Sequence, residues 1–195
     1  MKLIVGLGNP GVRYSGTRHN AGRDLAGHIA TREKLSWTQK KALQASVATT
    51  SWGDQEIILA RPETFMNLSG ESVSRLSRHF SVDISKDLLI VVDDVALPFG
   101  KLRLRASGSD GGHNGLKSVT ATLGTPVYPR LRMGIAPLEP SAKIPDDMAV
   151  FVLESFDREE KKAFKTVLEK CLEACRLWVG EPFAAAMNAV NSNSK

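Results

Sequence analysis

The stretch DLLIVVDD, residues 87–94, is a strongly apolar run that ends in two aspartates. A continuous apolar run of this length is typical of a strand whose two faces are both covered, as in an α/β sheet. A second apolar run, residues 2–7, opens the chain and leads into a glycine-rich turn. Both runs therefore predict buried strands, and both end beside polar residues that could bind a ligand or take part in catalysis.

Strand-like and helix-like segments alternate around these two runs, which indicates a single α/β domain over residues 1–195. Further strands are predicted at 44–51, 55–60, 101–106 and 130–136, and helices at 21–34, 69–80, just after 115, from 157 and from 182. The proline-rich segment 137–147 is predicted to be a mobile surface loop, and residues 191–195 are predicted to fray.

Composition limits the class of protein. The net charge of +5 and the pI of about 9.3 are compatible with a polyanionic partner such as nucleic acid, but also with simple solubility. No apolar stretch approaches the ~18 residues of a membrane span, and the apolar start is too short for a signal peptide. We therefore expect a cytoplasmic protein without membrane association. Cys171 and Cys175 stand four apart on a predicted helix. The sequence has no further Cys and no His near them, so we expect two buried thiols.

The glycines within residues 6–11 fit the G-x-G-x-x-G pattern of a dinucleotide-binding loop. That motif needs a helix directly after its second glycine. Here Pro10 keeps Asn9 away from helical angles, and helical periodicity starts only near Ala21. The sequence thus disfavours a dinucleotide-dependent oxidoreductase. The turn instead exposes Asn9 at the carboxyl end of a strand, where ligands of α/β proteins usually bind.

Other short polar side chains stand beside strand ends or before predicted helices: His19, Asn67, Asp93, His113 and Asn114. Neither a nucleophile elbow nor the spacing of metal ligands is present. An imidazole with a carboxylate and amides suits general-base activation of water. The carboxylate would fix the imidazole tautomer, while the amides would position the substrate or stabilise an oxyanion.

Each of these residues also has a purely structural interpretation. Asn67 could cap a helix, Asp93 could be a turn residue at a strand end, and His113 could hydrogen-bond within its own loop. Spacing alone does not decide between these interpretations and catalysis.

Four blocks of sequence, in unbroken order, resemble bacterial peptidyl-tRNA hydrolase. They are KLIVGLGNPGVRYSGTRHNAG (2–22), RPETFMNLSGESV (61–73), DDVALPFGKLRLRASGSDGGHNGLKS (93–118) and YPRLRMGI (128–135). The resemblance implies a monomeric α/β fold with a mixed, twisted sheet surrounded by helices. It also implies hydrolysis of the ester between a peptide and the 3′-terminal ribose of tRNA, without metal or cofactor.

The resemblance assigns roles residue by residue. His19 matches the family's catalytic histidine, Asp93 the aspartate that orients it, and Asn9 an asparagine at the reaction centre. The residues expected to bind the substrate around the ester are Tyr14, Met66, Asn67, His113 and Asn114.

Basic residues occupy alternate positions along two of the predicted strands. Alternation places Lys101, Arg103 and Arg105 on one face of their strand, and Arg130 and Arg132 on one face of theirs. Such stripes can bind tRNA phosphates with salt-sensitive affinity, or can simply face solvent. The family has phosphate-contacting basic residues where Arg105 and Arg132 stand. We therefore expect phosphate binding by these two, with Lys101 and Arg103 beside them.

Two departures from the family pattern are visible. Ala96 replaces the second carboxylate of the motif that follows Asp93, and the 137–147 loop, which borders the cleft in the family, is longer than usual. An alternative function is a non-catalytic RNA-binding protein of the same fold, of the splicing-factor type. The presence of Asn9, His19, Asp93 and Asn114 favours the enzyme.

Overall fold

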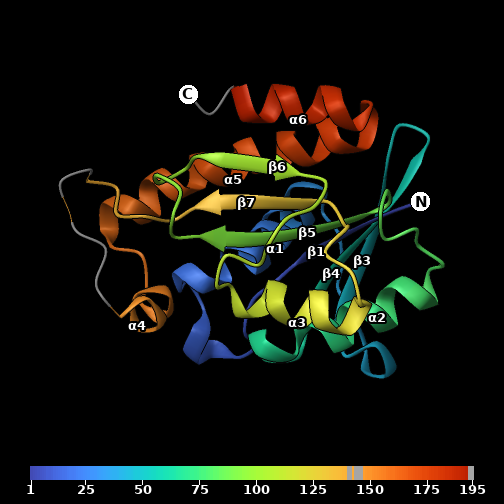
Figure 1. Ribbon diagram of the computed structural model, residues 1–195, viewed down its shortest axis with the longest axis horizontal. Coiled ribbons are helices and arrows are strands. Elements are labelled where there is room, and N and C mark those ends of the chain that lie inside the picture. Colours follow the sequence, from blue (N-terminus) through green and yellow to red (C-terminus); the bar gives the residue numbers. More distant parts are fainter. Residues whose placement is uncertain (140–141, 143–146, 193–195) are drawn as a thin grey trace.

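One seven-stranded mixed sheet, in the order β2-β3-β4-β1-β5-β7-β6, runs through the centre of the molecule (Figure 1). The computed structural model describes residues 1–139, 142 and 147–192. β1 pairs in parallel with β4 and β5, β5 pairs in parallel with β7, and the pairs β2–β3, β3–β4 and β6–β7 are antiparallel. The strands are β1 (Lys2–Gly6), β2 (Thr38–Lys40), β3 (Ala45–Trp52), β4 (Gln55–Pro62), β5 (Leu88–Asp94), β6 (Leu102–Arg105) and β7 (Arg130–Gly134).

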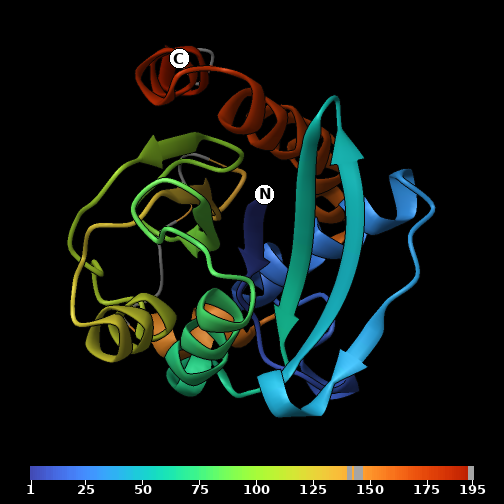
Figure 2. The same ribbon diagram turned by 90° about the vertical axis from the view of Figure 1, so that its right-hand side faces the viewer.

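Helices cover both faces of this sheet (Figures 1 and 2). α1 (Ala21–Arg32) and α5 (Arg158–Gly180) pack on one face, and α2 (Ser69–His79) and α3 (Asn114–Leu123) on the other. Successive residues of β1 face the two sides of the sheet alternately. Ile4 packs in the hydrophobic core with α1 and α5, whereas Leu3 and Val5 pack in the core with α2 and α3. Burying each such side chain stabilises the fold by about 1.5–3 kcal/mol. The α/β architecture predicted from the sequence is therefore confirmed.

Local sequence signals account for the long helix α5. Asp157 Oδ1 accepts the Glu160 N–H at 2.8 Å, and Glu160 Oε2 accepts the Asp157 N–H at 2.9 Å, which forms a capping box. Cys171 and Cys175 are buried and unpaired on the apolar stripe of the helix, as predicted. Burial raises the pKa of Cys175 to about 12, so this thiol is unreactive.

Short elements escaped the sequence analysis: β2, α4 (Met148–Leu153) and four 3₁₀ turns, η1 (Val12–Tyr14), η2 (Arg18–Asn20), η3 (Lys41–Leu43) and η4 (Met66–Leu68). Residues 191–192, the first two of the segment predicted to fray, belong to α6 (Phe183–Ser192). The Asn191 amide bonds both the N–H and the C=O of Leu104 and so covers the edge strand β6. Residues 193–195 and much of the predicted 137–147 loop lie outside the described residues.

The parallel pairing of β1 and β5 indicates where a ligand site can lie. Gly6, at the end of β1, pairs with Val91 of the neighbouring β5. The segments that follow both strands therefore emerge at one edge of the sheet, the usual place for a ligand in an α/β protein. None of the described helices is long and apolar enough to span a membrane.

Candidate active site

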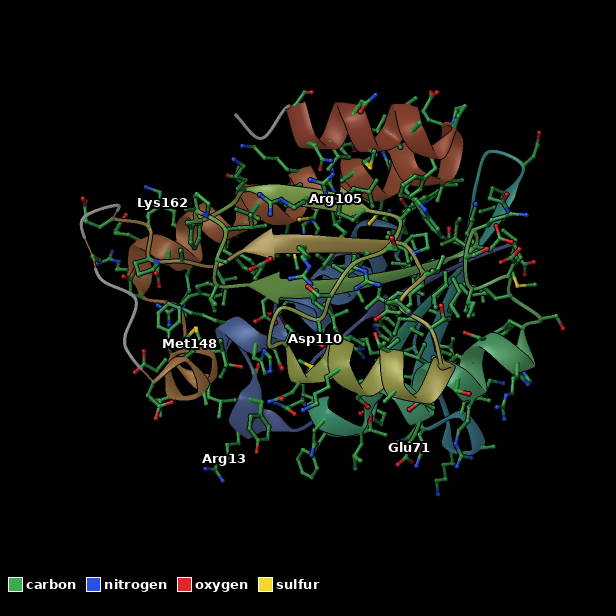
Figure 3. All side chains as sticks on the ribbon, in the orientation of Figure 1. Arg13, Glu71, Arg105, Asp110, Met148 and Lys162 are labelled. Carbon is green, nitrogen blue, oxygen red and sulfur yellow. The ribbon has the colours of Figure 1, made fainter. Side chains whose placement is uncertain are left out.

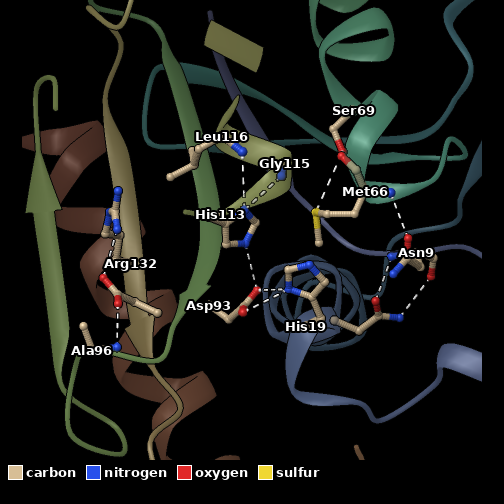
Figure 4. A network of polar contacts seen from close by, with 12 residues as sticks. Asn9, His19, Met66, Ser69, Asp93, Ala96, His113, Gly115, Leu116 and Arg132 are labelled. Atoms are coloured by element: carbon tan, nitrogen blue, oxygen red, sulfur yellow. Dashed lines mark hydrogen bonds and ion pairs between the residues drawn. The ribbon is translucent and has the colours of Figure 1, made fainter. Parts of the chain in front are cut away.

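A histidine and an aspartate meet at this edge of the sheet (Figure 4). Asp93 stands near the end of β5 and is 2% exposed, while His19 lies on η2 and is 8% exposed. His19 Nδ1 is 3.0 Å from each oxygen of the Asp93 carboxylate. The tertiary structure thus brings together two side chains 74 residues apart in the chain.

A second histidine holds the same carboxylate from the other side. His113 is the N-cap of α3, and its Nδ1 accepts the N–H groups of Gly115 at 3.1 Å and Leu116 at 3.3 Å. A ring nitrogen that accepts carries no hydrogen, so the proton of the neutral ring sits on Nε2. This Nε2 is 3.0 Å from Asp93 Oδ1 and donates to it. The hydrogen bond expected within the His113 loop is present, and it fixes the tautomer that binds Asp93.

The charges in this cluster follow from the same contacts. Burial opposes the charge of Asp93, but His113 and His19 together hold the pKa of its carboxyl below the usual range. Burial alone would lower the pKa of His19, yet the charge and hydrogen bond of Asp93 outweigh it and raise that pKa above 6.5. Asp93 is therefore ionised and binds the Nδ1 proton of His19. The Nε2 atom of His19 makes no hydrogen bond with any described residue. Because Nδ1 is bound to Asp93, Nε2 is the ring nitrogen that remains available to accept a proton.

The glycine-rich turn after β1 positions an asparagine pair. The Asn20 side chain accepts the Asn9 N–H at 2.7 Å and donates to the Asn9 C=O at 3.0 Å. Asn9 Oδ1 in turn accepts the Met66 N–H at 2.8 Å. A Cβ at Gly8 would lie 2.8 Å from Asn20 Oδ1, so the turn requires glycine for this close approach. α1 starts only at Ala21, so no helix follows directly after the second glycine of the turn, as the dinucleotide-binding motif requires.

The cavity beside the His19–Asp93 pair measures about 150 Å³. Its lining includes residues 111–114 and, from α4, Met148, Ala149 and Val152. The sequence analysis missed α4. Two local signals point to it: the apolar run 148–153 and the N-cap Asp147, whose side chain accepts the N–H groups of Ala149 and Val150. A larger cavity of about 760 Å³ between residues 98–102 and helices α5 and α6 contains no histidine, so its size does not indicate this chemistry.

Some of the predicted substrate-binding residues line the cavity beside His19, and the others lie outside it. Asn114 and His113 line the cavity. Met66 packs closely against Gly115 at the start of α3. A Cβ placed on Gly115 would lie only 2.6 Å from the Met66 Sδ. Asn67 is exposed on η4 and does not cap α2, whose N-cap is Leu68. The suggested capping role of Asn67 is therefore wrong.

Tyr14 lies outside the cavity. It is half-buried on η1, and its ring packs edge-on against Phe65 with the ring centroids 6.3 Å apart. It therefore belongs, with Asn67, to the surroundings of the site rather than to its centre.

Three of the four predicted phosphate-binding residues gather at a second cavity of about 250 Å³, namely Arg103, Arg105 and Arg132. Arg105 is exposed on β6, where Figure 3 shows it above β7. Arg132 is held in place, since its Nη1 lies 3.0 Å from Asp94 Oδ2 and its Nη2 donates to the Ser109 C=O at 2.7 Å. Asp94, missed by the sequence analysis, and Arg132 border both this basic cavity and the His19 cavity.

Two basic residues depart from the expected stripes. Lys101 precedes β6 and lines the larger cavity beside α5 and α6, apart from the three arginines. Arg130 borders the basic cavity but is 1% exposed, and its guanidinium donates to the C=O groups of Gly108 at 2.8 Å and Pro126 at 2.5 Å. Alternation placed Arg130 on the same face as Arg132, but loop carbonyls occupy the donors of Arg130.

His19, Asp93 and His113 are also the only group of three potential metal ligands among the described residues, with ligand atoms within 4.8 Å of one another. The hydrogen bonds argue for a different use. His113 Nδ1 is occupied by two N–H groups, and its Nε2 proton points at Asp93. Neither nitrogen of His113 therefore offers a free lone pair, so the group does not present three available ligand atoms to a metal ion.

Comparison with known proteins agrees with the resemblance noted in the sequence. The sequence model of the family "Peptidyl-tRNA hydrolase" matches residues 3–195. The peptidyl-tRNA hydrolase of Desulfitobacterium hafniense is 46% identical over 191 residues, covering 98% of this chain and 100% of the relative. That of a Roseiflexus species is 43% identical over 192 residues, covering 98% and 86%.

A solved structure of peptidyl-tRNA hydrolase from Acinetobacter baumannii matches this fold with a TM-score of 0.87 at 30% identity. The match covers 98% of this chain and 95% of that chain. Sequence and fold agree over nearly the whole length, and the chain belongs to the peptidyl-tRNA hydrolase family.

Proposed function

We propose that this protein hydrolyses the ester joining a peptide to the 3′-terminal ribose of tRNA, with His19 as the general base. Family membership supports the reaction and its substrate, peptidyl-tRNA. The observation that carries the role of His19 is its pairing with Asp93 through Nδ1, which leaves Nε2 without a partner among the described residues. General bases act best with a pKa near the working pH, and a histidine meets that condition.

The proton path follows from this pairing. Nε2 of His19 takes a proton from water as the water oxygen attacks the ester carbonyl carbon. The imidazolium that forms is stabilised by the ionised Asp93. When the tetrahedral intermediate collapses, the ribose oxygen leaves and takes the proton back from Nε2. The products are a peptide with a free carboxylate and a tRNA with a free 3′-terminal hydroxyl.

Amide groups provide positioning. Because Asn9 Oδ1 is bound to the Met66 N–H, the plane of the amide is fixed and Nδ2 remains a donor for the developing oxyanion. Asn114 contributes a second amide at the cavity wall. We assign substrate contacts farther from the ester to Met66, Asn67 and Tyr14.

The basic cavity serves the nucleic acid. Arg103, Arg105 and Arg132 would bind phosphates of the tRNA acceptor arm, which makes affinity dependent on salt. Because Arg132 borders both cavities, a phosphate bound there would lie next to the reaction centre.

The test compares N-acetyl-aminoacyl-tRNA with free aminoacyl-tRNA, with and without EDTA. We expect cleavage of the blocked ester only, at a rate that EDTA leaves unchanged. His19→Ala should abolish turnover and retain tRNA binding, whereas the matched variant His79→Ala, on the exposed end of α2, should remain active. The alternative function, RNA binding without catalysis, predicts binding without turnover in the unmodified protein.

We further propose that the protein acts as a monomer in the cytoplasm, where translation produces peptidyl-tRNA. All groups assigned to the reaction come from one chain, so the site does not need a second copy. Light scattering during size exclusion, at the concentration of the activity assay, tests the monomer.

A further inference from the structure

The residue directly before His19 forms a buried ion pair with α5. Arg18 Nη2 lies 2.6 Å from Glu160 Oε2, and the two residues are 7% and 3% exposed. The same Glu160 oxygen accepts the Asp157 N–H in the capping box of α5. The turn that bears His19 is therefore connected to the N-terminus of the longest helix through one carboxylate.

Arg18 also contacts the segment between α4 and α5. Its Nη1 donates to the Ser155 C=O at 3.0 Å, and its backbone N–H donates to the Glu154 C=O at 3.0 Å. The guanidinium lies 4.4 Å from the centre of the Phe151 ring on α4. One guanidinium thus contacts three successive parts of the chain: the α4 helix, the segment after it and the start of α5.

A neighbouring face of α4 lines the reaction cavity. Met148, which is labelled in Figure 3, borders the space beside His19 together with Ala149 and Val152, whereas Phe151 packs on Arg18. Any displacement of α4 relative to η2 would therefore change the distance between the cavity wall and the His19 ring.

We propose that Arg18 is a positioning residue that fixes α4 to the His19 turn, so that the cavity wall and the general base keep one geometry. The inference rests on the proposed role of His19. Arginine suits this task better than lysine, because its planar fork donates in two directions while its face packs on an aromatic ring. A buried ion pair does little for stability compared with an apolar contact, but it does demand one arrangement of its partners.

The first experiment is hydrogen–deuterium exchange on Arg18→Lys without substrate. This variant keeps the charge but loses the fork. We expect faster exchange at the α4 amides and unchanged protection in the central strands β1 and β5. Arg32→Lys is the matched control, because Arg32 pairs with Glu169 at 3.7 Å on the surface of α1. It should exchange like the parent.

The second experiment measures kinetics with N-acetyl-aminoacyl-tRNA. Misplacement of a reacting geometry by about 1 Å can cost about a hundredfold, so we expect kcat/KM of Arg18→Lys to fall by about ten- to a hundredfold. The Kd of deacylated tRNA should stay unchanged, because the arginines of the basic cavity are elsewhere. The midpoint of the pH–rate profile should also stay, since the His19–Asp93 pair is intact.

Three results would overturn the proposal: unchanged exchange at α4, faster exchange spread evenly over the whole protein, or loosened α4 with unchanged kcat/KM. If Arg18→Lys does not fold, Phe151→Leu and Glu160→Gln are judged by the same criteria, since each alters one contact of the guanidinium. Full turnover by His19→Ala would refute the proposed function, and the exchange of α4 would still test Arg18 by itself.

Discussion

Two neighbouring aspartates at the end of β5 have opposite surroundings. Asp93 is buried between two imidazoles, while Asp94 pairs with Arg132 and accepts the Ala96 N–H at 2.9 Å. Successive residues of a strand point to opposite sides, so Asp93 turns to the two histidines while Asp94 pairs with Arg132, where the basic cavity and the His19 cavity adjoin. The comparison teaches that the proposed proton transfer and the proposed phosphate binding would be adjacent in space but would depend on separate charge pairs.

Of the changes that test this comparison, Asp93→Asn should have the largest effect. An asparagine side chain presents only one acceptor oxygen to two imidazole donors and loses the charge that stabilises the His19 imidazolium. We expect kcat to fall by about a thousandfold, within the range of a general-base contribution. Steady-state kinetics near neutral pH measure it. A drop of less than tenfold would show that Asp93 and Asp94 are not different in the way proposed.

The pH dependence sharpens the same comparison. The active form of His19 is neutral, and Asp93 raises the pKa of His19 above 6.5. Activity should therefore be lost as the pH falls through this raised pKa. Loss of the charge in Asp93→Asn should move the midpoint to lower pH. Profiles of kcat/KM from about pH 5 to about pH 9 cover the range of a histidine; identical midpoints in the two proteins would contradict the pairing.

Effects at the basic cavity should appear in binding. Arg132→Ala or Arg105→Ala each remove a phosphate contact, so we expect KM to rise by about tenfold and the slope of log KM against log salt to fall by about one. The value of kcat should change little. Lys101→Ala is the matched control, because Lys101 lines the cavity beside α5 and α6 instead. A loss confined to kcat would place the arginines in the reaction rather than in binding.

Asp94→Asn should have the smallest effect. Arg132 keeps its bond to the Ser109 C=O, so its position changes little. Asparagine has the size of aspartate and keeps an oxygen that can accept from Arg132 Nη1, so we expect at most a few-fold change in KM with kcat intact. A loss of kcat similar to that of Asp93→Asn would remove the distinction between the two carboxylates.

Local patterns predicted much of the fold. The apolar run at β5 and the capping box at α5 are each set by residues close in sequence, and the structure contains both. β2 was missed because its three exposed polar residues, Thr38 to Lys40, carry no apolar signal. Alternation correctly placed Arg103 and Arg105 on the exposed face, but it could not show that loop carbonyls surround Arg130.

The sequence by itself determined the α/β class, the main elements and the residue types at the strand ends, and its motifs singled out His19, Asp93 and Asn9. Only the tertiary structure decided that His113 reaches Asp93, that Asp94 pairs with Arg132 and that Arg18 contacts Phe151 of α4 and pairs with Glu160 of α5. The reason is physical. Periodicity and caps depend on neighbours a few residues away, whereas these contacts join segments 20 to 142 residues apart.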